Sequence, residues 1–250
     1  MFCIEIAGLL VGIDNRYDEI EKRCKDYIVE PDREPDISVK TTDEILDPLV
    51  LLYREEGWEQ DISMGEIELA ALHGTIYPHL PEFDAAWIHA CAVEVDGVGY
   101  AFTAPSGYGK TTQARLWLDY FGSRARIING DNPIIRFMDG GCYICGTPFG
   151  GSEGYQVNTR IPLRGIGFLD HCDVNYMTRM DPAMAFSQMM RANQNHRMLS
   201  WENLESMMAI WEKILERIPV WQIHCNQSIQ AAKIAYEGMN AGTANQNARE

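Results

Sequence analysis

The sequence predicts an α/β protein in which a small N-terminal α/β lobe, residues 1–84, precedes a larger α/β unit, residues 85–240. Three observations predict this class. Strand-like alternation and helix-like spacing succeed one another along the chain. A proline- and aspartate-rich stretch interrupts the first part, and a glycine-rich turn stands between a strand and a helix in the second. The closing residues 241–250 have no apolar pattern and are expected to form a flexible tail.

The elements of the first part follow from local patterns. Residues 1–13 alternate as a strand does, and residues 17–29 have helical spacing. The stretch VEPDREPD, residues 29–36, breaks the chain before another short strand at residues 36–40. Residues 64–80 then read as an amphipathic helix that leads into the second part.

The second part opens with a predicted hairpin. Two β runs, residues 87–95 and 98–104, are separated by Asp96-Gly97, a strong turn signal. Residues 110–121 have helical periodicity and end at Gly122, a natural residue after a helix C-terminus. The segment between the second run and this helix is therefore a strand-to-helix turn.

That turn carries the pattern A-x-x-x-x-G-K-T, a P-loop in which Ala104 replaces the first glycine. Glycines let the backbone curl so that N–H groups point at a phosphate, at the end of a helix where the dipole also favours anions. The lysine then reaches the β- and γ-phosphates, and the threonine hydroxyl ligates Mg²⁺. The alternative is a glycine turn without a ligand. The predicted nucleotide-binding residues are Ser106, Gly107, Tyr108, Gly109, Lys110, Thr111 and Thr112.

A metal-bound nucleotide also calls for an acid at the end of a neighbouring strand. The apolar run after the helix ends at Asp131, one helix and one strand beyond Lys110. This spacing predicts a carboxylate beside the loop, so we expect Thr111 and Asp131 to bind the metal ion. An ordinary turn residue is the alternative for Asp131.

Composition and charge narrow the class of protein. The chain has 46% hydrophobic and 23% charged residues, as globular proteins do. No apolar run approaches the roughly 18 residues of a membrane span, and the first residues lack the basic start of a signal peptide. Together with seven cysteines, an odd number, this predicts a cytoplasmic location. The net charge of −15 argues against nucleic acid or a membrane surface as partner.

Four stretches of the second part form a recognisable set. They are a His-led hairpin running into the loop (IHACAVEVDGVGYAFTAPSGYGKTT), an acidic strand end (IINGD), a glycine-rich segment (GTPFGGSEG) and an R-G-I-G signature (IPLRGIGFLD). Together they resemble the HPr kinase/phosphorylase family with its phosphoenolpyruvate-carboxykinase type of P-loop. The resemblance covers residues 85 to about 240, and the first 84 residues match only loosely.

The resemblance implies phosphoryl transfer from ATP, with Mg²⁺, to a hydroxyl that is generally a serine. By position, Asp131 would bind metal or assist the acceptor, His89 would lie near the transferred group, and Arg164 would neutralise charge on the acceptor side. From the residues alone, His89 could equally be a structural strand residue and Arg164 part of an ion pair.

Two departures from the family pattern indicate a compact relative rather than a true HPr kinase. The strand end has Gly130 where the family has the first of two aspartates, and Pro162 stands where an acid precedes the signature arginine. A segment linked with HPr docking is also not recognisable. The main prediction is a kinase for a peptide, protein or small-molecule hydroxyl. The alternatives are a nucleotide-binding module or ATPase that has lost transfer and, less favoured, a carboxykinase.

The acidic residues gather in the N-terminal part. Residues 1–70 hold 19 Asp and Glu against 7 Lys and Arg, whereas residues 71–250 hold 17 against 14. A solvated face and a surface for a basic partner are both open interpretations. Methionines at helical spacing in the last third predict core or interface. Self-association is implied only by the resemblance.

Overall fold

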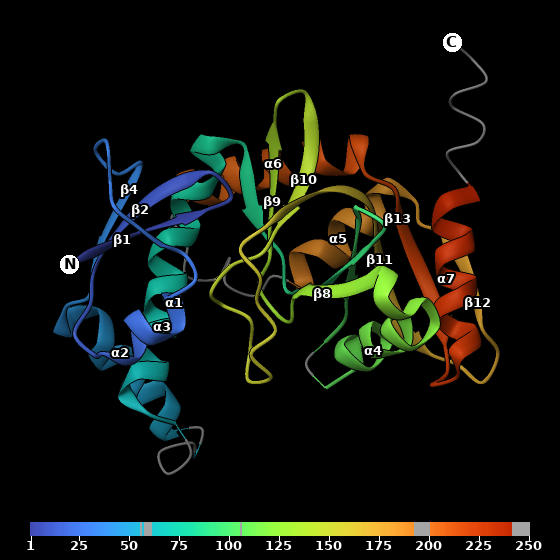
Figure 1. Cartoon of the computed structure of the whole chain (residues 1–250), viewed down its shortest axis with the longest axis horizontal. Helices are drawn as coiled ribbons and strands as arrows, with labels where there is room; N and C mark the ends of the chain where they lie inside the picture. Colours follow the sequence, from blue (N-terminus) through green and yellow to red (C-terminus); the bar gives the residue numbers. More distant parts are fainter. Residues whose placement is uncertain (56, 58–61, 106, 193–200, 242–250) are drawn as a thin grey trace.

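The computed structural model describes residues 1–55, 57, 62–105, 107–192 and 201–241. It is a mixed α/β structure with two sheets, one of four strands and one of nine. Figure 1 shows the four-stranded sheet and α1–α3 on one side, with the larger sheet and the remaining helices beside them. The tail predicted for residues 241–250 lies outside the described residues except for its first residue.

The smaller sheet, here called the N-terminal sheet, has the order β3-β1-β2-β4. Residues 1–13 were expected to form one strand, and that prediction is wrong. They form a hairpin whose turn residues, Ala7 and Gly8, have φ angles of 53° and 74°, the positive pair that matches the twist of a tight hairpin. The strands are β1 (Phe2–Ile6), β2 (Leu9–Asp14), β3 (Ile28–Val29) and β4 (Ile37–Lys40).

Three helices and a 3₁₀ segment accompany this sheet. The predicted helix after residue 63 is present, and its start is fixed by a capping box between Ser63 and Glu66. Buried Glu68 in the same helix accepts hydrogen bonds from the backbone N–H groups of Arg16 and Tyr17, at 2.7 and 2.8 Å. The elements are α1 (Glu19–Cys24), α2 (Asp43–Glu55), α3 (Met64–Ile76) and η1 (Tyr77–Phe83). The sequence interpretation had not identified α2.

The larger sheet follows the order β5-β9-β10-β11-β7-β6-β8, and β13 pairs with both β11 and β12. The predicted hairpin is present as β6 and β7, with Val95 opposite Val98 and positive φ at Asp96 and Gly97. Strands β7, β11 and β13 are parallel to one another. The strands are β5 (Ala85–Trp87), β6 (Ala90–Val95), β7 (Val98–Thr103), β8 (Ala125–Asn129), β9 (Ile134–Met138), β10 (Gly141–Cys145), β11 (Arg160–His171), β12 (Tyr176–Arg179) and β13 (Val220–Cys225).

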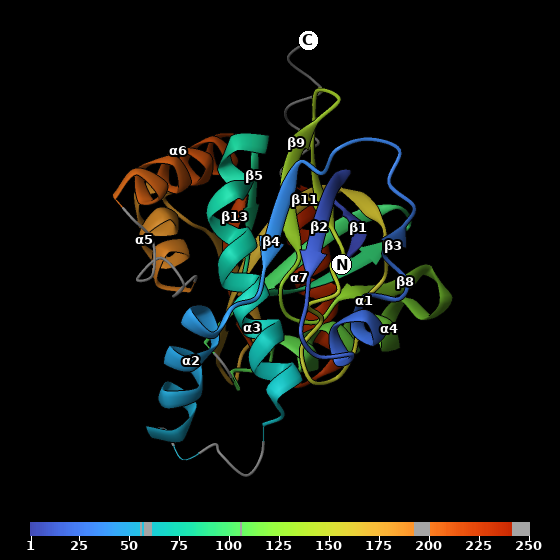
Figure 2. The ribbon, with the colours of Figure 1, turned by 90° about the vertical axis from the view of Figure 1, so that its left-hand side faces the viewer.

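Helices cover both faces of this sheet. Along β6, Ala90 and Ala92 belong to the core that contains α5 and α6, whereas Cys91 and Val93 belong to the core that contains α4 and α7. Figure 1 shows α4 and α7 next to each other, and α5 and α6 lie together in Figure 2. Their bounds are α4 (Lys110–Phe121), α5 (Pro182–Ala192), α6 (Trp201–Arg217) and α7 (Ile229–Ala241). No helix among the described residues is long and apolar enough to cross a bilayer.

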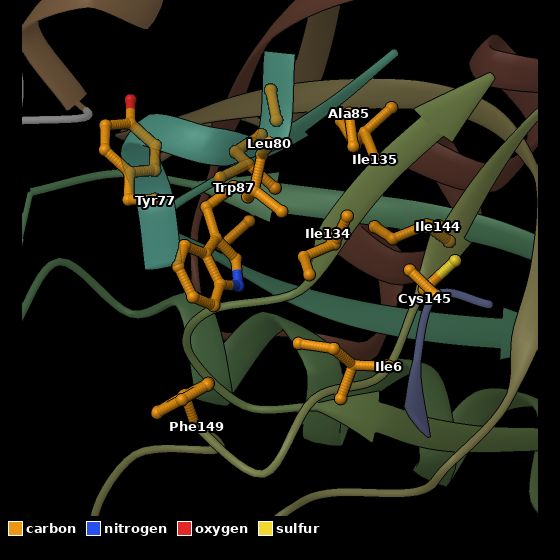
Figure 3. Close-up of a cluster of buried hydrophobic side chains, with 14 of the residues drawn as sticks. Ile6, Tyr77, Leu80, Ala85, Trp87, Ile134, Ile135, Ile144, Cys145 and Phe149 are labelled. Atoms are coloured by element: carbon orange, nitrogen blue, oxygen red, sulfur yellow. The ribbon is translucent and has the colours of Figure 1, made fainter. Parts of the chain in front are cut away.

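The two sheets share one hydrophobic core. Ile6 from β1 lies in the same buried cluster as Trp87, Ile134 and Phe149, which come from the larger sheet and the loops beside it. Figure 3 shows these side chains together with Tyr77 from η1. The boundary near residue 84 therefore divides the chain within a continuous core, and as a domain boundary it stays a prediction.

Candidate functional site

The loop between β7 and α4 lies at the carboxyl ends of the parallel strands, where α/β sheets bind ligands. Gly107 and Gly109 have φ angles of 75° and 88°, and Gly109 is the N-cap of α4. Both glycines therefore use a backbone conformation that other residues rarely adopt. Ser106, also predicted to bind nucleotide, lies outside the described residues.

Lys110 is the first residue of α4, and its side chain contacts the start of the loop. Its side chain is buried, and Nζ donates a hydrogen bond to the carbonyl of Ala104 at 3.2 Å. Burial lowers the pKa of Lys110, and the charge of Asp131 opposes that shift. The ammonium group is thus partly desolvated and close enough to Asp131 for the two charges to interact.

Asp131 is held in place by a buried polar network at the end of β8. The side-chain carbonyl of Asn129 accepts hydrogen bonds from the backbone N–H groups of Asp131 and Asn132, at 3.0 and 2.8 Å. The amide of Asn129 donates to Thr147, and both Asn129 and Thr147 are fully buried. Because these buried hydrogen bonds fix the turn that contains Asp131, its carboxylate has a defined position.

His89 forms a pair with this carboxylate. Its Nε2 lies 3.1 Å from Oδ1 of Asp131, and both side chains are partly exposed. The backbone fixes the pair as well, because the N–H of Ala90 donates to the carbonyl of Asp131 and the hydroxyl of Thr103 donates to the carbonyl of His89. The structure thus brings together His89 and Asp131, which are 42 positions apart in the sequence.

Lys110, Asp131 and His89 line one cleft with a volume of about 470 Å³. Most of the predicted nucleotide-binding residues face it, and the predicted metal ligands Thr111 and Asp131 lie in the same lining. The cleft is bordered by His89, Gly107, Gly109, Lys110, Thr111, Thr112, Gly130, Asp131, Gly150, Gly151, Ser152 and Glu153. Tyr108 lines a neighbouring hollow instead.

Residues 150–153 of the glycine-rich stretch line the cleft next to Asp131, and their backbone explains why position 130 is a glycine. A Cβ on Gly130 would lie 2.6 Å from the carbonyl oxygen of Gly150, and a Cβ on Gly151 would lie 3.0 Å from Cβ of Asp131. The absence of an acid at position 130 therefore has a steric reason. Sequence reasoning did not identify Glu153, whose carboxylate pairs with Arg115 of α4 at 2.6 Å.

The N-terminal sheet region contacts this glycine-rich stretch. Arg23, in the last turn of α1, donates to the carbonyl of Gly151 at 3.4 Å and accepts a hydrogen bond from the side chain of Gln156 at 2.9 Å through its own carbonyl. Gln156 in turn forms a β-bridge with Asn129, which positions Asp131. These contacts join two distant parts of the sequence, and no local pattern in either part could have indicated them.

Arg164 does not join the cleft. In the parallel pairing of β11 with β7, Phe168 lies opposite Thr103, next to the loop, whereas Arg164 occupies a bulge near the start of β7. A strand advances about 3.3 Å per residue, so Arg164 lies roughly 13 Å from the level of Phe168. The structure therefore does not support the expected position of Arg164 on the acceptor side of this chain's cleft.

A second histidine, His73, has a largely buried ring and lies close enough to the His89–Asp131 pair for the charges of the pair to act on it. The ring of His73 from α3 is 4.2 Å from that of Trp87. Burial lowers the pKa of His73 to about 4, the charge of Asp131 opposes this shift, and His89 adds to it. His73 is therefore neutral at pH 7, so it contributes packing against Trp87 and no charge near Asp131.

Similarity to known proteins is found among solved structures. A scan against protein-family models finds no match, and a search of curated proteins finds none either. Among solved structures, the Hpr(Ser) kinase/phosphatase from Coxiella burnetii is similar at 12% sequence identity and a TM-score of 0.36, over 65% of this chain and 96% of that chain. This is a distant structural relationship at a low TM-score, and it carries no argument about function.

Proposed function

We propose that the protein is a kinase that transfers the γ-phosphate of Mg-ATP to a hydroxyl, most often a serine, of a peptide or protein acceptor. The observation that carries this proposal is the cleft in which a buried lysine, a helix N-terminus, a threonine hydroxyl and a His–Asp pair meet. Each of these groups has a distinct task in phosphoryl transfer, which relies mainly on positioning and charge neutralisation.

The cation and the helix N-terminus would hold the phosphates. Lys110 now donates to the Ala104 carbonyl, and that hydrogen bond can be exchanged for one to a phosphate oxygen. The residues at the start of α4 line the same cleft, and the free backbone N–H groups of a helix N-terminus bind anions. The curled backbone at Gly107 and Gly109 leaves room for the phosphate to approach.

The donor set in the cleft fits Mg²⁺. This ion prefers oxygen ligands and usually keeps bound waters and phosphate oxygens, so a hydroxyl from Thr111 and a carboxylate from Asp131 are enough from the protein. No group of three or more His, Cys, Asp or Glu that could hold a metal occurs in the described part of the chain. When bound, the ion would neutralise charge on the phosphates.

The acceptor hydroxyl would attack from the side of His89. A bond forms between the hydroxyl oxygen and the γ-phosphorus, the bond to the β–γ bridging oxygen breaks, and ADP leaves. The hydroxyl proton passes to the His89–Asp131 pair, whose members lie 3.1 Å apart. Asn129 holds the backbone N–H of Asp131, and the side chain of Asn132 donates to the Asp131 carboxylate, so this acceptor of the proton is preorganised.

The test separates binding from transfer. Purified protein is incubated with γ-labelled ATP, Mg²⁺ and size-fractionated peptides and proteins from the host. Asp131→Asn should lower transfer at least 100-fold, the range for removal of a general base, while Lys110→Ala should weaken ATP binding itself. Asp139→Asn, at an exposed turn far along the sequence from the loop, serves as the matched control.

Two results would contradict the proposal. Asp131→Asn with undiminished transfer would remove the pair from the mechanism. If ATP binds but its label stays on ATP with every acceptor fraction, the protein would be a nucleotide-binding module. If the label appears only as free phosphate, it would be an ATPase. The missing acid at Gly130 favours these alternatives.

A further inference from the structure

A second hollow lies beside the loop that joins β7 to α4. It is lined by the loop, by the first turns of α4 and by the carboxyl ends of β11 and β13. Gly109 and Thr112 line both this hollow and the larger cleft. The two spaces are therefore neighbours, and the first turn of α4 lies between them.

The mouth of this hollow offers flat aromatic surfaces above an apolar floor. The rings of Tyr108 and His171 lie 4.8 Å apart with an angle of 41° between their planes, and Tyr108 is 43% exposed. Leu116, Leu169 and Cys225 form the floor. The enclosed volume is only about 20 Å³, which is enough for one water molecule, so a planar ring would lie across the mouth against the two side chains.

Polar groups stand at the edge of the same surface. The carboxylate of Asp170 pairs with Nδ1 of His224 at 3.2 Å, and the exposed side chain of Gln227 lies on the rim. The loop that carries Gln227 is fixed, because the N–H of Asn226 donates to the side chain of Asn175 at 2.9 Å. Carboxylate and amide groups can accept from and donate to the edge of a nucleobase.

From this arrangement we infer that the second hollow binds the purine ring of the nucleotide, with Tyr108 and His171 as its stacking surface. The inference rests on the proposed function, because it needs a nucleotide whose phosphates occupy the larger cleft. Thr112 follows Lys110 and Thr111 on the helix and borders both spaces, so it lies where a chain of phosphates continues toward a base. An apolar floor, aromatic rings and a few polar edge groups are what a site for a planar heterocycle requires.

The test compares Mg-ATP with Mg-tripolyphosphate, which has the phosphates but no base. Dissociation constants of both are measured by calorimetry for the native protein, Tyr108→Ala, Tyr108→Phe, His171→Ala and Lys110→Ala. Tyr108→Ala and His171→Ala should each weaken ATP binding about tenfold, within the range for loss of one stacking partner, and leave tripolyphosphate binding unchanged. Tyr108→Phe keeps the ring and should bind ATP as the native protein does.

The failures are distinguishable. If Tyr108→Ala and His171→Ala leave the ratio of the two dissociation constants at its native value, the base lies elsewhere, although the kinase proposal stands. If the native protein binds neither ATP nor tripolyphosphate, both proposals are overturned. Lys110→Ala should weaken both ligands, and thermal unfolding of each variant verifies that it is folded.

Discussion

Gly130 offers the sharpest test of how the cleft is built. The obvious engineering step is to restore the missing carboxylate with Gly130→Asp, yet any Cβ at this position would lie 2.6 Å from the carbonyl oxygen of Gly150 and 3.3 Å from Cβ of Tyr155. Observed Cβ atoms essentially never approach closer than 3.0 Å. The obstacle is backbone, so the 146–154 segment must move away from Asp131.

The expected magnitude follows from overpacking. Forcing extra atoms into a packed site costs about 1–3 kcal/mol, and the smaller unfolded-state entropy of alanine returns about 0.4–1 kcal/mol. A net loss of about 1–2 kcal/mol corresponds to a fall in Tm of roughly 2–8 °C for a chain of this size. Gly130→Ala isolates this effect, since it adds the Cβ without a charge.

The assay is thermal unfolding combined with the transfer assay, and Gly74 supplies the control. Gly74 lies inside α3 with nothing within 4 Å of a Cβ and no positive φ, so Gly74→Ala should be neutral or slightly stabilising. Gly130→Ala should lower both Tm and transfer, and Gly130→Asp should not exceed native transfer. A Gly130→Asp variant with native Tm and faster transfer would refute the steric explanation.

Three further predictions concern sites outside the loop. Burial lowers the pKa of His73 from 6.5 to about 4 in the folded chain, so between these pH values the unfolded chain binds more protons. The free energy of unfolding should therefore fall by up to about 3 kcal/mol as the pH drops from 6.5 to 4. Denaturant titration at several pH values should show this fall in the native protein and a smaller fall in His73→Gln. Arg164→Ala should leave the dissociation constant for Mg-ATP within twofold, because Arg164 lies outside the cleft; a large loss would place it there. If the exposed acids of α2 recognise a basic acceptor, the double variant Glu44→Lys, Asp47→Lys should raise the KM for that acceptor severalfold at low salt and leave kcat unchanged. An unchanged KM would indicate that these acids form a solvated face without a role in recognition.

Elements marked by local chemistry were predictable from the sequence. The hairpin turn at Asp96-Gly97 and the glycines at both ends of α4 require particular φ angles, and the structure has those angles. The first hairpin was not predicted, because its turn is Ala7-Gly8 and the apolar alternation continues from β1 through the turn into β2. Alternation reports which face a residue occupies, and it does not report where a strand reverses.

The candidate site divides in the same way. The loop and Asp131 were found because each sits in a short motif with a defined strand or helix beside it. Arg164 was carried over from a motif on β11, a strand of 12 residues that spans about 40 Å, and a motif does not say which end of such a strand faces the loop. Glu153, Gln156 and the ring pair at Tyr108 depend on contacts between distant segments, which local patterns do not contain.

The contacts of the N-terminal sheet bear on any experiment with a shortened chain. Ile6 belongs to the hydrophobic cluster that it shares with the larger sheet, and the carbonyl of Arg23 accepts a hydrogen bond from Gln156, whose partner across the β-bridge is Asn129. Removing the first 84 residues would therefore expose buried apolar surface and release the glycine-rich stretch next to Asp131. A loss of transfer in that deletion would not distinguish acceptor recognition from collapse of the cleft, and for this reason the role of the acidic surface has to be measured through exposed charges on α2.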